Sequence, residues 1–589
     1  MLAPKDRTTL VEHLRPPDGA KVTRLVGTTF TLDLIAAFLP ALAITGDDTD
    51  VGDSIPVLAA LRNSIGVIDI FPQCGQIAVP RSTSRLLSLL EPAIHPVVAP
   101  PARLFHPKVW MLLWENDGAS HARLVVATRN LTLSHSWDVV VSLDGRVTPR
   151  DVAGNSGLSS LVDYLLSHTV TPVSTGRVRL LREFQRAIAR VEWQEPDRDV
   201  ALHAIHVLGL GGQPPRIDFG GSRRLIISPF LGDDALLGMA SDRHPNTLVS
   251  TQGAIDKLKP RTAAALTDMY ILNPDAAVAD DTNAVSSLPA ALHAKLYVVD
   301  QPRARSRMLV GSANATHAGF NGNVEVLLEF SGPTKLIGVE QVTGKDGLGS
   351  LLVSTKPEEA PAEVVEDDET ARRLAGALRM LASRPLAATV SHSDNGYTLA
   401  LSGPAPASSS DVSRLECWPL TVPRQRHDLA SGSAVDLTFT DLALEDVTAL
   451  FVFSVTGHAG MSRSTVVIAD LRGERQGRVD AIVTSMISNA NDFQRLLELL
   501  LSFGGRFGSA PPPLGDDDAD VTPSWETPRN ELFEVLMRAA ADGPDSLDRL
   551  SGVVESIIRA HDPNKVLPDG FTELWNAVSS ARGRRADDE

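Results

Sequence analysis

The chain has 589 residues and carries 55 lysines and arginines against 72 aspartates and glutamates, which gives a formal net charge of −17. This length predicts two or more domains. A hydrophobic content of 43% with 22% charged residues is typical of a globular protein. The acidic balance argues against extended, nonspecific binding of duplex DNA, which usually needs a basic surface, but it leaves room for a local basic cleft.

Other features of the composition exclude several classes. Cys74 and Cys417 are the two cysteines and lie far apart, so neither a disulfide framework nor a zinc ribbon is expected. The N-terminal segment has no apolar signal core. The longest apolar run, 34–44, is too short to span a membrane and contains Pro40. We therefore expect a cytoplasmic protein that does not associate with membranes.

Two segments of the chain, about 200 residues apart, have the same order of predicted elements. Residues 23–40 and 223–240 each read as a buried strand, a polar turn and an apolar helix. A second strand is expected after each, over 65–71 and 246–251. Similarity over such a length predicts two copies of a domain rather than a solenoid of short repeats.

Each copy continues with a His-x-Lys triplet, then an asparagine, then an acid. The two sets are His106, Lys108, Asn130 and Asp138, and His293, Lys295, Asn314 and Glu325. The spacing from lysine to asparagine is 22 positions in the first set and 19 in the second. A single triplet carries no information, but two sets in the same order predict half-sites that converge on one phosphate.

The residue types fit chemistry at phosphorus. An imidazole serves as a nucleophile or as an acid and base, and an ammonium and an amide hold phosphoryl oxygens. Histidine and lysine two positions apart share one face of a strand, and an anion pocket explains two polar groups on an apolar strand. Asn130 and Asn314 also suit helix N-caps, a position that itself attracts phosphate.

The pattern resembles the phospholipase D superfamily, whose signature is His-x-Lys, a spaced acid and a Gly-Ser-x-Asn turn. The second copy matches with His293, Lys295, Asp300 and the turn from Gly311 to Asn314. In the first copy Leu113 takes the place of Asp300, and Thr128-Arg129 replaces the Gly-Ser pair before Asn130. This combination is similar to the tyrosyl-DNA phosphodiesterase branch, and the resemblance covers about residues 23–330.

The resemblance implies an α/β fold with two pseudo-symmetric halves, each a mixed sheet flanked by helices. It implies that His106 is the nucleophile and His293 the acid and base, while the residues alone do not fix that order. The lysines and asparagines would stabilise charge on the phosphoryl oxygens, and Asp138 and Glu325 would orient the histidines. Thr132, Ser312 and Thr316 would contact the substrate. No cofactor or metal is implied.

Two acidic, proline-containing stretches mark domain boundaries. Short alternating runs after the first stretch suggest an antiparallel β-sandwich, and the end of the chain reads as helical. The expected domains are a first half over 1–172, a second half over 173–354, an acidic linker and helix over 355–385, a β-sandwich over 386–472 and a helical region over 473–589.

The function that these observations favour is a metal-independent phosphodiesterase acting through a covalent phosphohistidine. By family analogy alone, it would be a nuclease or a DNA-end-processing enzyme, with bacterial defence as a setting. The expected partners are nucleic acid, as single strands or ends, and proteins bound through the C-terminal region. Two alternatives stay open: an enzyme acting on phospholipids or small phosphodiesters, and a degenerate nucleic-acid-binding scaffold in a multi-protein complex.

Overall fold

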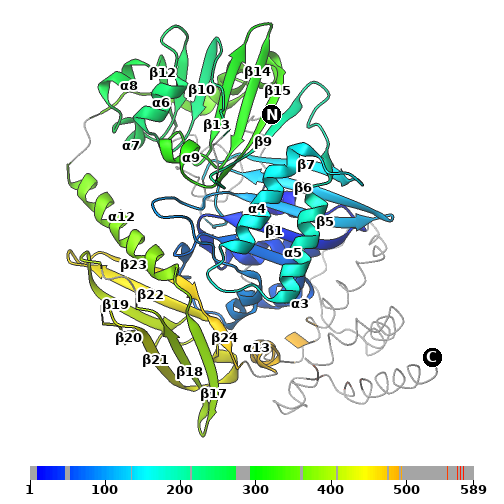
Figure 1. The fold of residues 1–589 in the computed structure, drawn as a ribbon, viewed down its shortest axis with the longest axis vertical. Helices are drawn as coiled ribbons and strands as arrows, with labels where there is room; N and C mark the ends of the chain where they lie inside the picture. Colours follow the sequence, from blue (N-terminus) through cyan, green and yellow to red (C-terminus); the bar gives the residue numbers. More distant parts are fainter. Residues whose placement is uncertain are drawn as a thin grey trace, which may run out of the picture.

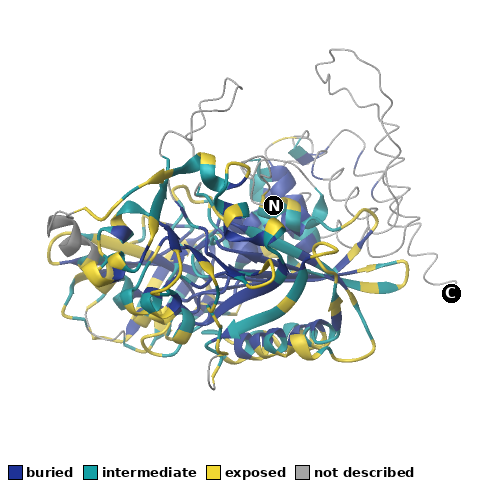
Figure 2. Cartoon of the chain, turned by 90° about the horizontal axis from the view of Figure 1, so that it is seen from above, coloured by how far each residue is buried: buried dark blue, intermediate teal, exposed yellow. Residues whose placement is uncertain are grey.

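The computed structural model describes residues 9–46, 53–133, 136–211, 215–273, 292–358, 362–405, 409–430, 432–473 and 477–487, with scattered residues beyond. The fold is mixed α/β, as predicted, with several sheets and helices packed around them (Figure 1). The central strands are mostly buried, whereas exposed residues follow the loops and the outer faces of the helices (Figure 2).

A six-stranded sheet organises the first half, in the order β3-β1-β5-β6-β7-β8. Its strands are β1 (Lys21–Thr29), β3 (Ile68–Pro72), β5 (Val109–Asn116), β6 (Ala119–Ala127), β7 (Val140–Val147) and β8 (Val191–Trp193). β1 pairs with β3 in parallel, and the other pairs are antiparallel. Because β8 belongs to this sheet, the first half extends past the expected boundary at residue 172.

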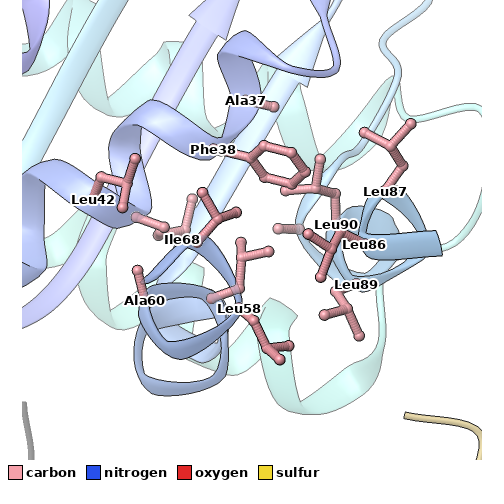
Figure 3. Packing of buried hydrophobic residues seen from close by; sticks show 14 of the residues in the cluster. Ala37, Phe38, Leu42, Leu58, Ala60, Ile68, Leu86, Leu87, Leu89 and Leu90 are labelled. Carbon is pink, nitrogen blue, oxygen red and sulfur yellow. The ribbon is translucent and has the colours of Figure 1, made fainter. Parts of the chain in front are cut away.

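Helices complete the first half. α4 and α5 cover one face of the sheet (Figure 1), and apolar side chains such as Phe38, Leu58 and Ile68 pack together beside it (Figure 3). The remaining elements of this half are α1 (Leu10–Leu14), β2 (Leu32–Asp33), η1 (Ala36–Phe38), α2 (Leu39–Thr45), α3 (Ser54–Ser64), η2 (Ile65–Val67), β4 (Ile77–Ala78), η3 (Arg85–Ala93), η4 (Ala153–Asn155), α4 (Ser156–Ser167) and α5 (Thr175–Ile188).

The second half contains an eight-stranded sheet in the order β16-β12-β11-β10-β13-β14-β15-β9. Its strands are β9 (Ala201–Leu208), β10 (Arg223–Ile227), β11 (Asn246–Val249), β12 (Asp268–Leu272), β13 (Leu296–Gln301), β14 (Arg305–Gly311), β15 (Glu325–Pro333) and β16 (Leu352–Ser354). Its helices are α6 (Asp233–Met239), α7 (Gln252–Ile255), α8 (Pro260–Ala264), α9 (His317–Asn321), α10 (Thr334–Ile337), α11 (Val339–Thr343) and η6 (Leu348–Leu351).

The two sheets share a series of strands with the same order and directions. The series β3-β1-β5-β6-β7 corresponds to β11-β10-β13-β14-β15, with a parallel first pair and antiparallel pairs after it. A joint hydrophobic core, which includes Met111 and Val126 from one sheet and Val326 and Leu328 from the other, holds the halves together. This contact fixes the position of one half relative to the other.

The C-terminal region begins with a long helix, α12 (Ala362–Ala382), which includes most of the acidic run that the sequence suggested as a linker. Two four-stranded sheets follow, ordered β21-β18-β17-β24 and β20-β19-β22-β23. The sequence predicted an antiparallel β-sandwich. One pair, β17 with β24, is parallel instead. The elements are β17 (Ala387–Ser393), β18 (Gly396–Gly403), β19 (Val412–Pro419), β20 (His427–Asp428), β21 (Val435–Leu442), η7 (Leu444–Asp446), β22 (Leu450–Gly457), β23 (Ser462–Ile468), β24 (Asp470–Arg472) and α13 (Arg478–Met486).

This region packs directly against the first half. One hydrophobic core combines Leu58 and Leu87 of the first half with Leu450, Val466 and Ile482 of the C-terminal region. The helices expected after α13 lie largely outside the described residues. Among the residues that the structure describes, no helix is long and apolar enough to cross a membrane.

The shared core generates a prediction about truncation. A fragment of residues 1–354 leaves the apolar side chains around Leu58 and Leu87 exposed, because their partners from the C-terminal region are removed. We expect this fragment to bind a hydrophobic dye and to lose cooperative melting, as followed by circular dichroism and dye fluorescence. A fragment that melts cooperatively near the temperature of the full chain would contradict the importance of this contact.

Candidate active site

The two His-x-Lys triplets lie in extended segments immediately before β5 and β13. Lys108 is 1% exposed and Lys295 0% exposed, an unusual degree of burial for lysine. Two backbone hydrogen bonds hold the histidine segments across the interface: His106 N donates to Val324 O (2.9 Å) and His293 N donates to Trp137 O (2.7 Å). Each triplet is therefore held by the segment that precedes the acid of the opposite half.

The ring of His106 is oriented by Glu325 from the second half. Its Nδ1 lies 2.9 and 3.0 Å from the two carboxylate oxygens, so the proton belongs on Nδ1 and the lone pair on Nε2. The edge of Phe30 packs on the ring, with 5.0 Å between ring centroids. Lys108 Nζ lies 2.9 Å from Nε2 and also 2.9 Å from the backbone oxygen of His106. The reactive nitrogen is thus a hydrogen-bond acceptor.

Glu325 is fully buried and has further support. Ser312 donates its hydroxyl proton to one carboxylate oxygen, and Asn323 Nδ2 lies 3.4 Å from the other. Ser312 Oγ also accepts a hydrogen bond from Val326 N at 3.0 Å. Ser312, expected to contact substrate, is fully buried and instead positions the carboxylate that orients His106.

His293 has a different partner. Its Nδ1 lies 2.9 Å from the backbone oxygen of Thr128, which can only accept, so Nδ1 carries a proton and Nε2 has the lone pair. Lys295 Nζ donates to the same oxygen (3.1 Å) and to His293 O (2.7 Å). Its 3.1 Å approach to His293 Nδ1 is then a contact between two donors rather than a hydrogen bond. A neutral backbone oxygen therefore orients the ring of His293, whereas the Glu325 carboxylate orients the ring of His106.

Thr128 occupies the position of Ser312. Val139 N donates to Thr128 Oγ1 at 2.8 Å, just as Val326 N donates to Ser312 Oγ. Thr128-x-Asn130 therefore corresponds to Ser312-x-Asn314, and the first copy retains the hydroxyl of the turn. The sequence could have predicted this correspondence, because both copies have a hydroxyl residue, threonine or serine, two positions before the asparagine.

The two asparagines each have a buried polar atom that forms no hydrogen bond with a described residue. These are the Oδ1 atoms of Asn130 and Asn314, and the lack of a partner is uncommon for buried polar atoms. Neither asparagine caps a helix as the sequence allowed: Thr316 is the N-cap of α9, accepting from Gly319 N at 3.0 Å. Thr132 lies at the matching place, with its N–H donating to Asn130 O at 3.0 Å.

Among the described residues, neither Asp138 nor Asp300 forms a hydrogen bond with His106 or His293, whose Nδ1 atoms face Glu325 and Thr128 O. Asp138 is exposed, and surrounding protein atoms nevertheless desolvate its carboxyl and raise its pKa, against the opposing charges of Arg129 and Lys295. Asp300 is buried and accepts from Ser306 Oγ (2.8 Å) and Val339 N (3.0 Å). Asp300 thus ties β13 to β14 and α11.

Burial and mutual repulsion keep the site poor in protons. Burial lowers the pKa of His106 to about 4, although Glu325 acts against this shift. Burial, followed by the charges of Lys295 and Lys108, lowers the pKa of His293 to about 3. Burial also lowers the pKa of Lys108 to about 7 and that of Lys295 well below its ordinary value. Charges from both halves contribute to these shifts, so the half-sites are electrostatically one site.

Within the part of the chain that the structure describes, no group of three or more histidine, cysteine, aspartate or glutamate side chains is arranged to hold a metal ion. The charged groups that converge here are instead two lysines, two histidines and one buried carboxylate. That set has more potential positive than negative charge, which suits an anionic ligand.

Comparisons with solved structures find chains that align with part of this one. No protein-family model matches the chain, and no curated protein matches it. The fold is similar to yeast tyrosyl-DNA phosphodiesterase, with 12% sequence identity, coverage of 56% of this chain and 89% of that chain, and a TM-score of 0.34. It is also similar to phosphatidylserine synthase from Haemophilus influenzae Rd KW20, with 12% identity, coverage of 62% and 90%, and a TM-score of 0.35.

The lowered histidine pKa values generate a prediction about acid stability. Both histidines bind protons near pH 6.5 in the unfolded chain but only near pH 3 to 4 in the folded one, so the unfolded state gains protons first as the pH falls. Stability should therefore decline below about pH 6.5. Thermal melts at pH 7 and pH 5 should show a smaller drop in melting temperature for His106→Gln than for the natural chain. An equal drop would mean that His106 is not held neutral.

Proposed function

We propose that this protein is a phosphodiesterase of the phospholipase D superfamily, built from two pseudo-symmetric halves that form one active site. The observation that carries the proposal is the meeting of two buried His-x-Lys triplets at the interface, with His106 bonded to a glutamate from the opposite half. The corresponding strand series of the two sheets supports the pseudo-symmetry.

His106 is the nucleophile in this proposal. Its Nε2 lone pair attacks phosphorus, a P–N bond forms, and the bond from phosphorus to the leaving oxygen breaks. Glu325 accepts the hydrogen bond from Nδ1–H and stabilises the positive charge that develops on the ring, as a carboxylate does in other histidine-dependent sites. His293 has only a neutral carbonyl at Nδ1, so it is the weaker base and the better acid. This difference supports the order of roles that the family resemblance implied.

His293 transfers the protons. With a phosphodiester bound, the His293 ring takes up a proton at Nε2 and transfers it to the leaving oxygen as the first product departs. The neutral ring then removes a proton from water. The resulting hydroxide attacks phosphorus, the P–N bond to His106 breaks, and His293 is protonated again. The low pKa of His293 belongs to the protein alone, and a bound phosphodiester anion would raise it by offsetting the charges of Lys108 and Lys295.

The lysines and asparagines hold the phosphoryl group. Lys108 Nζ, which now donates to His106 Nε2, would donate to a phosphoryl oxygen once substrate binds and would free the lone pair for attack. Lys295 and the amides of Asn130 and Asn314 would bind the remaining oxygens. The two ammonium groups supply the charge stabilisation that a divalent ion supplies in other phosphodiesterases, so we propose chemistry that needs no metal.

The substrate we propose is a nucleic-acid phosphodiester, single-stranded or at an end, in a nuclease or DNA-end-processing role. The lysines of the site would become cationic around a bound anion, in an otherwise acidic chain, which supports a ligand that is bound locally rather than along a long duplex. A place in bacterial defence, a cytoplasmic location and protein partners for the C-terminal region rest on family analogy and composition.

A pair of substitutions tests the division of roles. Glu325→Gln removes the charge that orients and stabilises His106 and should lower kcat for a nitrophenyl phosphodiester by about 100-fold or more. Asp138→Asn is the matched control, because Asp138 bonds to neither histidine, and it should change kcat by less than about threefold. If Asp138→Asn were as damaging as Glu325→Gln, the assigned partner of His293 would be wrong.

The covalent intermediate provides the second test. In His293→Ala, a substrate with a good leaving group should still phosphorylate His106, but breakdown should be slow, so an acid-labile, base-stable adduct accumulates and is visible by intact mass. Activity of the natural chain should survive excess chelator. An adduct on His293 in a His106→Ala variant would reverse the roles, and no adduct on either residue in single-turnover experiments, together with no hydrolysis, would refute the proposed function.

A further inference from the structure

A large cavity lies where the two halves meet the C-terminal region. Its volume is about 970 Å³, which is at the upper end of the range for ligand pockets. Its lining comes from residues 75–78 of the first half, from residues 229–231, Thr251, Gly253, Ala254 and Lys257 of the second half, and from α12 and β23. All three parts of the molecule therefore contribute a wall.

The walls contributed by the C-terminal region are held firmly in place. Gly75 has a φ of +72°, and a Cβ at this position would lie 2.7 Å from the Cα of Arg379, so the glycine allows α12 to approach the first half closely. Thr465 Oγ1 of β23 donates to Ile77 O at 3.0 Å. Helix α12 and strand β23 are thus attached to the same loop of the first half.

Two residues of the cavity lining are neighbours of residues next to the proposed catalytic set. Thr31 lines it and directly follows Phe30, whose ring packs on His106. From the other half Leu231 lines it and forms a β-bridge with Ala315, the residue after Asn314. The histidines, lysines and asparagines of the site are not among the lining residues, so the cavity would hold a part of the substrate beyond the scissile phosphate.

The lining consists mainly of small and apolar residues, and it includes three basic side chains and one aromatic ring. Phe230 is 60% exposed, a high value for phenylalanine, and it lines the cavity. Arg372 and Arg463 also line it and are exposed, and neither forms an ion pair with a described residue. Lys257 lines it as well and is engaged with another residue. No carboxylate occurs among the described lining residues, in a chain whose net charge is −17.

We propose that this cavity binds the single-stranded nucleic-acid segment next to the scissile phosphodiester, with a base stacked on Phe230 and backbone phosphates on Arg372 and Arg463. Stacking on an exposed aromatic ring needs an unpaired base, and arginine binds phosphate with two parallel N–H groups. This inference rests on the proposed function and adds to it the place where the substrate strand binds. It gives α12 and β23 a direct part in substrate binding.

The test separates binding from catalysis by using the full chain with His106→Ala, which cannot form the covalent intermediate. The probe is a fluorescent oligodeoxythymidylate of about 12 nucleotides, read by anisotropy. Phe230→Ala, Arg372→Glu and Arg463→Glu should each raise its Kd about tenfold, and each arginine substitution should reduce the salt dependence by about 0.7 in log–log slope. Arg150→Glu and Val353→Ala, exposed residues away from the cavity lining, are the controls and should leave Kd unchanged.

The same cavity substitutions made with His106 intact should leave kcat/KM for a small nitrophenyl phosphodiester within about twofold of the natural chain. Cavity variants that bind the oligonucleotide as tightly as the two controls would overturn the inference while hydrolysis of the small substrate upholds the proposed function. Absence of that hydrolysis in the natural chain would instead refute the function. Equal weakening of single-stranded and duplex probes would show that the cavity does not select single strands.

Discussion

The hydrogen bond between His106 Nδ1 and Glu325 is the interaction on which the rest of the site depends. It joins the two halves of the chain, so it forms only if the sheets are placed in one relative register. The backbone bonds from His106 N to Val324 O and from His293 N to Trp137 O set that register, and the core shared by β5, β6 and β15 holds it. Neither half contains a complete histidine site, so the chemistry that we propose requires the interface.

Placing both half-sites at the interface buries more basic groups than acidic ones, which reduces the stability of the folded state. Lys108 and Lys295 are almost fully buried with one buried carboxylate nearby, and burial lowers the pKa of both ammonium groups. Such groups reduce the stability of the folded state, as active-site groups commonly do. An anion bound between them would be stabilised by both charges at once and would return the lysines toward their ordinary pKa. The same desolvation that destabilises the free protein thus strengthens the attraction for a phosphodiester.

The sequence alone predicted the mixed α/β class and two half-sites on buried strands. The repeated His-x-Lys triplets within apolar runs indicated both the burial and the pairing of the half-sites. It did not predict how the partners pair. The acceptor of His293 is the backbone oxygen of Thr128, and a backbone carbonyl has no signature in sequence. Whether Ser312 faces substrate or Glu325 depends on the path of the chain around the turn, not on its motif. The acidic run at the start of α12 looked like a linker because its charges obscured the helix that packing stabilises.

The C-terminal region is packed into the rest of the molecule rather than appended to it. Its apolar residues complete the core of the first half, and α12 and β23 contribute two walls of the large cavity. This placement also reconciles the net charge of −17 with a polyanionic ligand. Attraction acts over about a Debye length, roughly 8 Å in physiological salt, so the charges that line a cavity matter more to a bound strand than the sum over the whole chain. In the binding mode that we propose, the acidic exterior discourages binding of long duplexes, while the cavity lined by Arg372 and Arg463 accepts a strand that can enter it.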